Sequence, residues 1–197
     1  MPRAPGQVDE AKTQAILDAA AELAATLGPK VSMEAIARRA GVSKQTLYNR
    51  FPSRLEIARA LATRRSDLLT QPLQSGGDAE AVLTAYATGL LEKIVRENAA
   101  GALRSVALMS TEAPELAQAV YQAGPATGQG RLADWLAAQT RAGRLNTPDP
   151  VAAAEMFAGM TLGHAHLRAF LGIAQPEIDT AARAHETAQR FLRAFAV

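Results

Sequence analysis

The sequence predicts an all-α protein of about nine helices. Alanine is abundant and β-branched residues are sparse, a composition that favours helices over strands. Apolar residues recur at three- and four-residue spacing through most of the chain, which is the period of an amphipathic helix. Short runs of Gly, Pro, Ser and Asn separate these stretches and mark helix ends. With 48% hydrophobic residues, a chain of 197 residues can bury a sizeable core.

The first expected helix is capped by Asp9 or Thr13 and ends at Gly28-Pro29. Its apolar stripe consists of Ile16, Leu17, Ala20, Leu23, Ala24 and Leu27. The spacing of these residues places them along one side, so this helix should pack against its successors in the chain.

Two short helices hinged at Gly41 follow it. Ser32 is a good cap for the first of them, and Ser43 caps the second, whose buried edge is Leu47 and Phe51. Pro52 stops that helix, and a fourth helix begins after a further serine. Two helices joined by a glycine turn have the form of a helix-turn-helix, which places its second helix in the major groove of DNA. An ordinary helical hairpin with a solvated polar face is the alternative.

Residues 9 to about 69 resemble the DNA-reading head of the TetR family of bacterial repressors. The residues that carry the resemblance are Leu27-Gly28, the run from Ile36 to Ser43, Thr46-Leu47-Tyr48 and the run from Phe51 to Arg54. The chain departs from the family pattern at Ala24 and Ala25, where a large aromatic residue is usual, and at Arg54, where lysine is usual. The resemblance implies a DNA-binding domain over residues 9–69 and a ligand-binding and dimerisation domain over residues 78–197.

The expected contacts with double-stranded DNA lie in and around the second helix of the hinged pair. Gln and Asn can bond adenine edges and Thr can touch a thymine methyl. The residues expected nearest to the bases are Gln45, Thr46 and Asn49. Those expected to help at the groove or backbone are Ser43, Lys44 and Tyr48. The expected phosphate contacts are Ser32, Arg50 and Arg54, with Arg39 as a weaker candidate.

The charge distribution agrees with a nucleic-acid partner for the N-terminal part. Residues 1–70 hold 11 Lys and Arg against seven Asp and Glu, whereas residues 71–197 hold 10 against 12. The net charge of +2 is therefore the sum of a positive charge on residues 1–70 and a negative charge on residues 71–197. The excess has the sign that phosphate attraction requires, and it supports the motif without establishing it.

The polar stretch from Gln71 to Asp78, rich in Pro, Gly and Ser, is the best boundary signal in the chain. Beyond it, helices are expected over residues 79–97, 100–110, 114–142 with a disturbance at Gly124-Pro125, 151–171 and 176–196. The last two are helices eight and nine of the predicted fold, and both are rich in small residues. The resemblance implies that they pair with their copies in a homodimer. Their sequences alone show amphipathic helices that are equally able to pack inside one subunit.

Aromatic and methionine side chains on these later helices are candidates for lining a ligand cavity, which the resemblance also implies. The candidates are Tyr86, Leu90, Leu103, Met109, Tyr121, Trp135, Met156, Phe157, Met160 and His164. An ordinary apolar core is an equally supported reading of the same pattern. They carry little fixed charge, so the expected effector is a small, mostly apolar and possibly aromatic molecule.

Several other functions lack the residues that they need. The chain has no cysteine, and His164 and His166 point to opposite sides of a helix, so no metal site is expected. The stretch from Gly124 to Gly130 lacks the Lys-Ser/Thr ending of a phosphate loop. No nucleophile lies in a recognisable catalytic motif. Neither an enzyme nor a cofactor is therefore expected.

The N-terminal residues do not form a signal peptide, and no run of 18 apolar residues is present. We therefore expect a cytoplasmic protein without a membrane partner. The sequence as a whole predicts a DNA-binding transcriptional regulator, most simply a repressor that a small ligand releases from a palindromic operator. The alternatives are a helix-turn-helix protein controlled by a protein partner or acting architecturally on DNA, and, with less support, a small helical enzyme.

Overall fold

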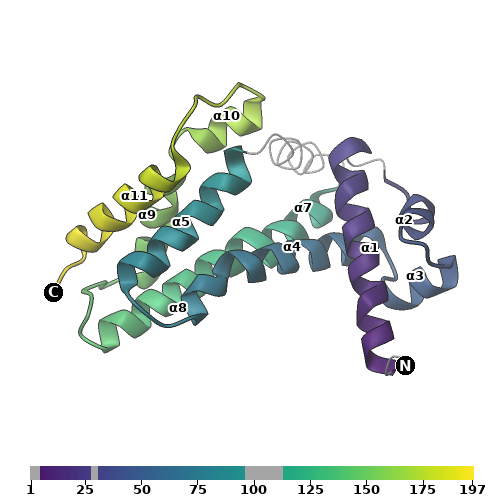
Figure 1. Ribbon diagram of the computed structural model, residues 1–197, viewed down its shortest axis with the longest axis horizontal. Helices are drawn as coiled ribbons and strands as arrows, with labels where there is room; N and C mark the ends of the chain where they lie inside the picture. Colours follow the sequence, from purple (N-terminus) through teal and green to yellow (C-terminus); the bar gives the residue numbers. More distant parts are fainter. Residues whose placement is uncertain (1–4, 28–30, 96–112) are drawn as a thin grey trace.

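The structure is a computed structural model that describes residues 5–27, 31–95 and 113–197, and every regular element in these ranges is a helix (Figure 1). The predicted all-α class is therefore confirmed. The expected helix over residues 100–110, with the ligand candidates Leu103 and Met109, lies outside the described residues.

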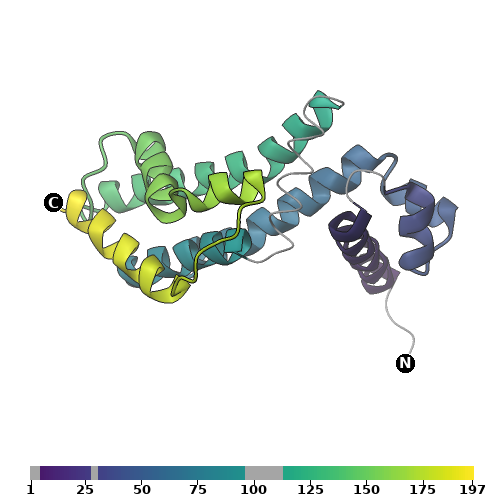
Figure 2. The ribbon, with the colours of Figure 1, turned by 90° about the horizontal axis from the view of Figure 1, so that it is seen from above.

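The N-terminal part consists of α1 (Pro5–Leu27), α2 (Met33–Arg39), α3 (Lys44–Arg50) and the first half of α4 (Arg54–Thr70). These helices share one apolar core, in which Ile16 of α1 and Leu47 of α3 are fully buried. Ile57 and Leu61 of α4 close the core from the other side. We call this unit the head; Figures 1 and 2 both place α2 and α3 at the end of the molecule opposite the C-terminus.

Serine caps fix where the helices of the head begin. Ser32, Ser43 and Ser53 accept hydrogen bonds from the backbone N–H groups three residues later, at 3.1, 3.1 and 3.3 Å. Each bond satisfies a donor that the first helical turn leaves without a partner. Between α2 and α3, Gly41 has a φ of 66°, a left-handed conformation that favours glycine. The predicted glycine hinge and all three caps are thus present.

The remaining helices form a second unit, which we call the body. Its helices are α5 (Ala79–Val95), α7 (Pro114–Tyr121), the π-helical turn η3 (Gln122–Ala126), α8 (Thr127–Arg141), α9 (Pro150–Leu162), α10 (Ala165–Leu171) and α11 (Thr180–Ala194). Four of them, α5, α8, α9 and α11, share a core centred on Phe157 and Phe191, whose rings meet edge to face at 5.0 Å. A division of the chain into domains at residues 69 and 78 stays a prediction.

One long helix, α4, connects the head to the body (Figure 2). Its first half belongs to the core of the head, and Leu69 near its end packs against the core of the body. The expected boundary at residues 71–78 begins with a short 3-10 helix, η2 (Gln71–Gln74), and ends in a turn where Gly76 and Gly77 both have positive φ. Because α4 takes part in both cores, a change in its tilt moves the head relative to the body.

Two expected boundaries in the body are wrong. The helix expected over residues 151–171 is broken at Gly163, whose φ of 46° ends α9 and starts α10 in a new direction. The helix expected over residues 176–196 begins only at Thr180, after Asp179 caps it through the N–H of Ala182 at 3.0 Å. Glycine tolerates a positive φ and aspartate is a strong N-cap, so both corrections follow from local chemistry.

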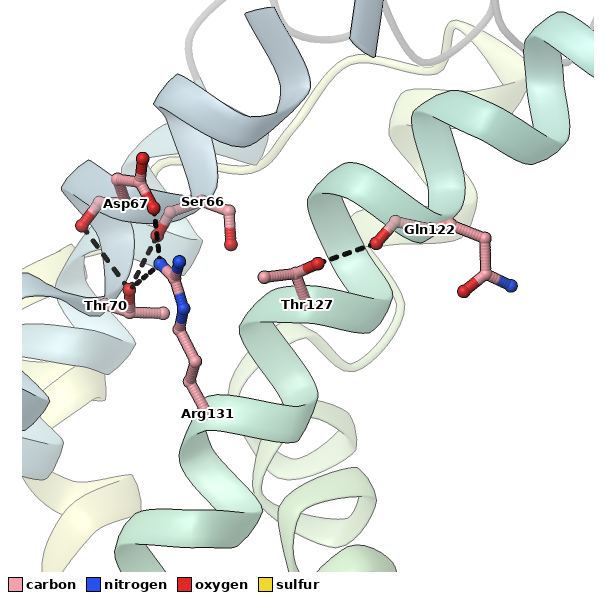
Figure 3. A network of polar contacts seen from close by, with 6 residues as sticks. All are labelled: Ser66, Asp67, Thr70, Gln122, Thr127 and Arg131. Atoms are coloured by element: carbon pink, nitrogen blue, oxygen red, sulfur yellow. Dashed lines mark hydrogen bonds and ion pairs between the residues drawn. The ribbon is translucent and has the colours of Figure 1, made fainter. Parts of the chain in front are cut away.

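The disturbance expected at Gly124-Pro125 is present as the π-helical turn η3. Proline inside a helix lacks an N–H and its ring collides with the carbonyl of the preceding turn, and a widened turn relieves both problems. The hydroxyl of Thr127 donates to the carbonyl of Gln122 at 2.7 Å across this turn (Figure 3). The chain thereby continues from α7 into α8 without a loop.

Candidate nucleic-acid interface

One side of α3 is open to solvent and carries polar side chains. Leu47 is fully buried and fixes the rotation of the helix, which leaves Gln45, Tyr48 and Asn49 exposed. Gln45 and Asn49 lie one turn apart on the same face. This is the arrangement with which a recognition helix reads base edges in a major groove, and the assignment of these residues to bases stays a prediction.

Thr46 is less exposed than Gln45 and Asn49, the two other residues expected nearest to the bases. Its side chain is only half exposed, its backbone N–H donates to Ser43 Oγ at 3.1 Å, and its hydroxyl lies 2.9 Å from the same oxygen. Thr46 and Ser43 therefore form the start of α3 together. The methyl group of Thr46 is the part that remains available for a thymine contact.

Two cations expected near DNA are held in ion pairs on the surface. Lys44 Nζ lies 3.2 Å from Glu34 Oε1, and Arg39 Nη2 lies 2.6 Å from Glu22 Oε2. Glu34 accepts a hydrogen bond from its own backbone N–H and lies beside Lys44, and both effects lower the pKa of its carboxyl group. Exposed ion pairs of this kind contribute little to stability, so a DNA phosphate can replace either carboxylate at small cost.

Arg50 and Arg54 also tie the head together. Arg50 Nη1 donates to Thr13 Oγ1 of α1 at 2.8 Å, and Arg54 Nη1 donates to the carbonyl of Val31 at 3.4 Å. The sequence contained a signal for the first contact, because Arg50 lies three residues after the buried Leu47 and so shares its face. That either arginine contacts a DNA phosphate stays a prediction. Such a contact would be a second role beside the structural role in the head. Ser32 is exposed at the start of α2.

The expected effector residues do not gather in one place. Tyr86 and Phe157 are buried in the core of the body, with ring centroids 6.1 Å apart, while Leu90 and Trp135 pack half-buried against that core. Burial raises the pKa of Tyr86 to about 12. The described candidates that remain are exposed: Tyr121, Met156, Met160 and His164. Exposed fractions of 56% and 41% for Met156 and Met160 place these two side chains on the outer surface of α9.

Neither of two hollows lined by described residues contains these candidates. One, of about 880 Å³, lies between the end of α5 and the loop of residues 172–179. The other, of about 440 Å³, lies in the head between α1 and the first half of α4. The residues of the described ranges contain no group of three potential metal ligands. They also contain no helix that is long and apolar enough to cross a membrane.

The junction between α4 and α8 connects the head to the body, and sequence analysis did not identify it. Arg131 of α8 forms an ion pair with Asp67 at 2.6 Å and donates to Thr70 Oγ1 at 2.9 Å (Figure 3). Thr70 is fully buried and donates onward to the carbonyl of Ser66 at 2.8 Å. Since 61 residues separate Arg131 from Thr70, no local pattern could have paired them.

Small residues bring the two helices of this junction close together. A Cβ added to Gly124 would lie 3.5 Å from Ala62 Cβ, and one added to Gly128 would lie 3.5 Å from Ser66 Oγ. The hydroxyl of Tyr86 donates to the carbonyl of Gly128 at 3.4 Å. The position of α4, and with it that of the head, is therefore set by contacts with α8 and η3.

Two family models match the chain. The model of the tetR family of bacterial regulatory proteins matches residues 16–61, and that of the C-terminal domain of AefR-like transcriptional repressors matches residues 81–197. The first match falls in the head and the second in the body, and residues 62–80 lie between them. No curated protein matches the chain.

Solved structures with the same fold span nearly the whole chain. A TetR-family transcriptional regulator from Mesorhizobium loti is 24% identical, with a TM-score of 0.78 over 96% of this chain and 98% of its own. The flavonoid-responsive regulator FrrA is 29% identical, with a TM-score of 0.69 over 94% and 97%. A TetR transcriptional regulator from Agrobacterium tumefaciens is 24% identical, with a TM-score of 0.74 over 99% and 96%.

Proposed function

The chain belongs to the TetR family of bacterial regulatory proteins, and from this premise we propose that it is a repressor that leaves a palindromic DNA operator when a small ligand binds its body. Membership makes it a DNA-binding transcriptional regulator and not an enzyme. Repression, ligand release and the identity of the contacts go further and are the proposal. The observation that carries it is the exposed polar face of α3 on a capped, tightly packed head.

A homodimer is part of the proposal, because one recognition helix reads too few base pairs to define an operator. The outer surfaces of α9 and α10 carry exposed apolar side chains: Val151, Met156, Met160, Leu167, Phe170 and Leu171. A group of this kind favours contact with a partner over contact with water. We therefore assign Met156 and Met160 to the dimer seam, although the sequence pattern grouped them with the effector residues. The neighbouring helix α11 carries four charged residues, Arg183, Glu186, Arg190 and Arg193, and its Leu192 is half-buried in its own subunit.

The effector is proposed to act through α4. Two heads in a dimer fit DNA only when their recognition helices lie about one helical turn apart, roughly 34–36 Å. A ligand that binds one tilt of α4 better than the other shifts the population between the fitting and non-fitting states. The name of the relative FrrA describes a regulator that responds to flavonoids, which are aromatic, and this supports an aromatic effector.

Selection of bound DNA from a random pool tests the proposal. We expect the protein to enrich a palindrome whose half-sites are one turn apart, and we expect some apolar or aromatic compound in a panel to release it. Enrichment without release by any compound would favour control by a protein partner. Absence of any enriched sequence would contradict a sequence-specific regulator.

A further inference from the structure

A lysine and a glutamate lie side by side at the start of α3. Lys44 is the first residue of this helix, and its Nζ donates to Oε1 of Glu34, on the neighbouring helix α2, at 3.2 Å. Both side chains are partly exposed, at 66% and 48%. In a helix-turn-helix, the first residues of the second helix contact base edges, and the first helix crosses the DNA backbone. The pair therefore lies where the head is expected to meet DNA.

The packing of the head keeps Lys44 on the side of α3 that is open to solvent. Leu47 is fully buried and turns the opposite side outward. Lys44 and Tyr48 lie one turn apart, and both are exposed beside Gln45. Lys44 thus belongs to the same open surface as the residues expected to read bases, and Figure 1 shows α2 and α3 next to one another at that end of the molecule.

Stability does not explain why a carboxylate lies at this surface. The helices α2 and α3 already share the core of the head and are joined by the turn at Gly41, and an exposed ion pair adds little to this. A phosphate can take the place of Glu34 at small cost in stability, but it then lies beside the carboxylate, which repels it. A residue that weakens phosphate attraction is useful where it improves discrimination between DNA sequences.

Glu34 is held in place as a charged group. Its own backbone N–H and the ammonium of Lys44 donate to the carboxylate, and these hydrogen bonds, together with the charge of Lys44, lower the pKa of Glu34. An ammonium has three N–H donors, and one is directed at Glu34, so two remain for another acceptor. An acceptor on a base edge has no net charge and is not repelled by Glu34, whereas a phosphate is repelled. The pair thus favours a base as the DNA partner of Lys44.

We propose that Lys44 reads a guanine in each half-site of the operator, and that Glu34 positions Lys44 for this contact and keeps it from the phosphates of other DNA. Guanine presents two adjacent acceptors, O6 and N7, in the major groove, and lysine is one of the side chains that bond them. The inference rests on the proposed function, because it names one base of the operator and the two residues that select it.

The experiment uses the full-length wild type, Lys44→Gln, Glu34→Gln and the double variant. The matched control is Glu186→Gln, which removes the same charge from an exposed ion pair with Arg190 in the body. Fluorescence anisotropy over a series of salt concentrations measures affinity for the selected operator, for its single-base variants and for a duplex of the same composition in shuffled order. Thermal unfolding of every variant is recorded alongside.

Lys44→Gln should remove the preference for guanine at one position of each half-site and keep the preferences at the other positions. Replacing that guanine in one half-site should weaken binding of the wild type about tenfold, and binding of Lys44→Gln by less than about twofold. Uniform weakening on every duplex, with a shallower dependence on salt, would mean that Lys44 contacts a phosphate and would overturn the inference. A Lys44-dependent position that prefers another base would overturn the assignment to guanine.

Glu34→Gln should raise the affinity for the shuffled duplex at least about threefold, and it should steepen the slope of log affinity against log salt by about one unit for each lysine freed to contact a phosphate. Operator affinity should rise less, so the preference for the operator falls. The change should be largely absent from the double variant, because Glu34 acts through Lys44, and absent from Glu186→Gln.

Three results would overturn the role of Glu34. The first is an unchanged affinity of Glu34→Gln for the shuffled duplex, and the second is an equal rise in the double variant. The third is a lower Tm of Glu34→Gln with equal weakening on all duplexes, because the pair would then be structural only.

The wild type separates this inference from the proposed function. If it prefers the operator over the shuffled duplex and Lys44→Gln keeps every base preference, the proposed function stands and the inference fails. If the wild type binds both duplexes equally, the proposed function fails, and the inference fails with it.

Discussion

Replacing Arg131 by methionine should loosen the junction between α4 and α8. The variant keeps most of the side-chain length and removes the guanidinium that joins Asp67 and Thr70. The ion pair is partly exposed, at 35% and 54%, and contributes about 0.5 kcal/mol. The hydrogen bond to the buried Thr70 hydroxyl adds about 0.5–1.5 kcal/mol, and Thr70 keeps its own donor bond to Ser66. The expected loss of unfolding free energy is therefore about 1–2 kcal/mol.

Thermal unfolding measures this loss, and about 1–2 kcal/mol corresponds to a fall of roughly 2–8 °C in Tm for a chain of this size. Double-mutant cycles with Asp67→Asn and Thr70→Val should assign the larger coupling to Thr70. The matched control is Arg190→Met, which breaks an exposed pair with Glu186 inside α11 and should cost less than about 0.5 kcal/mol. If Arg131→Met melts together with the wild type, or if it shows no coupling to Thr70, the account of the junction is wrong.

Three further predictions concern the interface, the dimer and the core. Gln45→Ala should weaken binding to the selected operator by about 1–3 kcal/mol and relax the preference at one base pair. A competition assay with single-base variants of the operator measures both effects. Equal weakening on every DNA sequence would mean that Gln45 contacts the DNA backbone and not a base. Met160→Glu should dissociate the dimer because it buries an unpaired carboxylate, and light scattering measures this change. The control Leu68→Glu, on the exposed side of α4, should leave the dimer intact. A dimeric Met160→Glu protein would mean that the dimer interface lies elsewhere. Since the folded state raises the pKa of Tyr86 to about 12, above the ordinary value of 10, the wild type should lose stability between pH 10 and 12. Tyr86→Phe should show a smaller loss over that range in alkaline denaturation, and identical curves for the two proteins would refute the burial of this hydroxyl.

The head could be predicted from the sequence because its signals are local. A serine before an apolar repeat, a glycine after it and a proline at the end of the next helix each act within four residues. The structure confirms the caps at Ser32 and Ser43 and the positive φ of Gly41. In the same way, Pro125 predicted the disturbed helical turn between α7 and α8.

The body was harder to predict because its signals are shared between distant segments. Methionines at helical spacing fit a cavity lining, a core and a dimer seam equally well, and only the packing shows that Met156 and Met160 face outward. The helix break at Gly163 could not be predicted, because Gly163 is one of many small residues in an alanine-rich stretch. The partners of Arg131 depend on how α4 lies against α8, and hydrophobic periodicity carries no information about that packing.

The most direct test of the central claim is the affinity of the purified protein for its selected operator and for a duplex of the same composition in shuffled order, measured by fluorescence anisotropy over a series of salt concentrations. The account predicts that the operator binds at least about 10³-fold more tightly at physiological salt. It also predicts that the logarithm of the affinity falls linearly with the logarithm of the salt concentration for both duplexes, because both share the phosphate contacts. Equal affinity for the two duplexes would contradict the claim that α3 reads a DNA sequence.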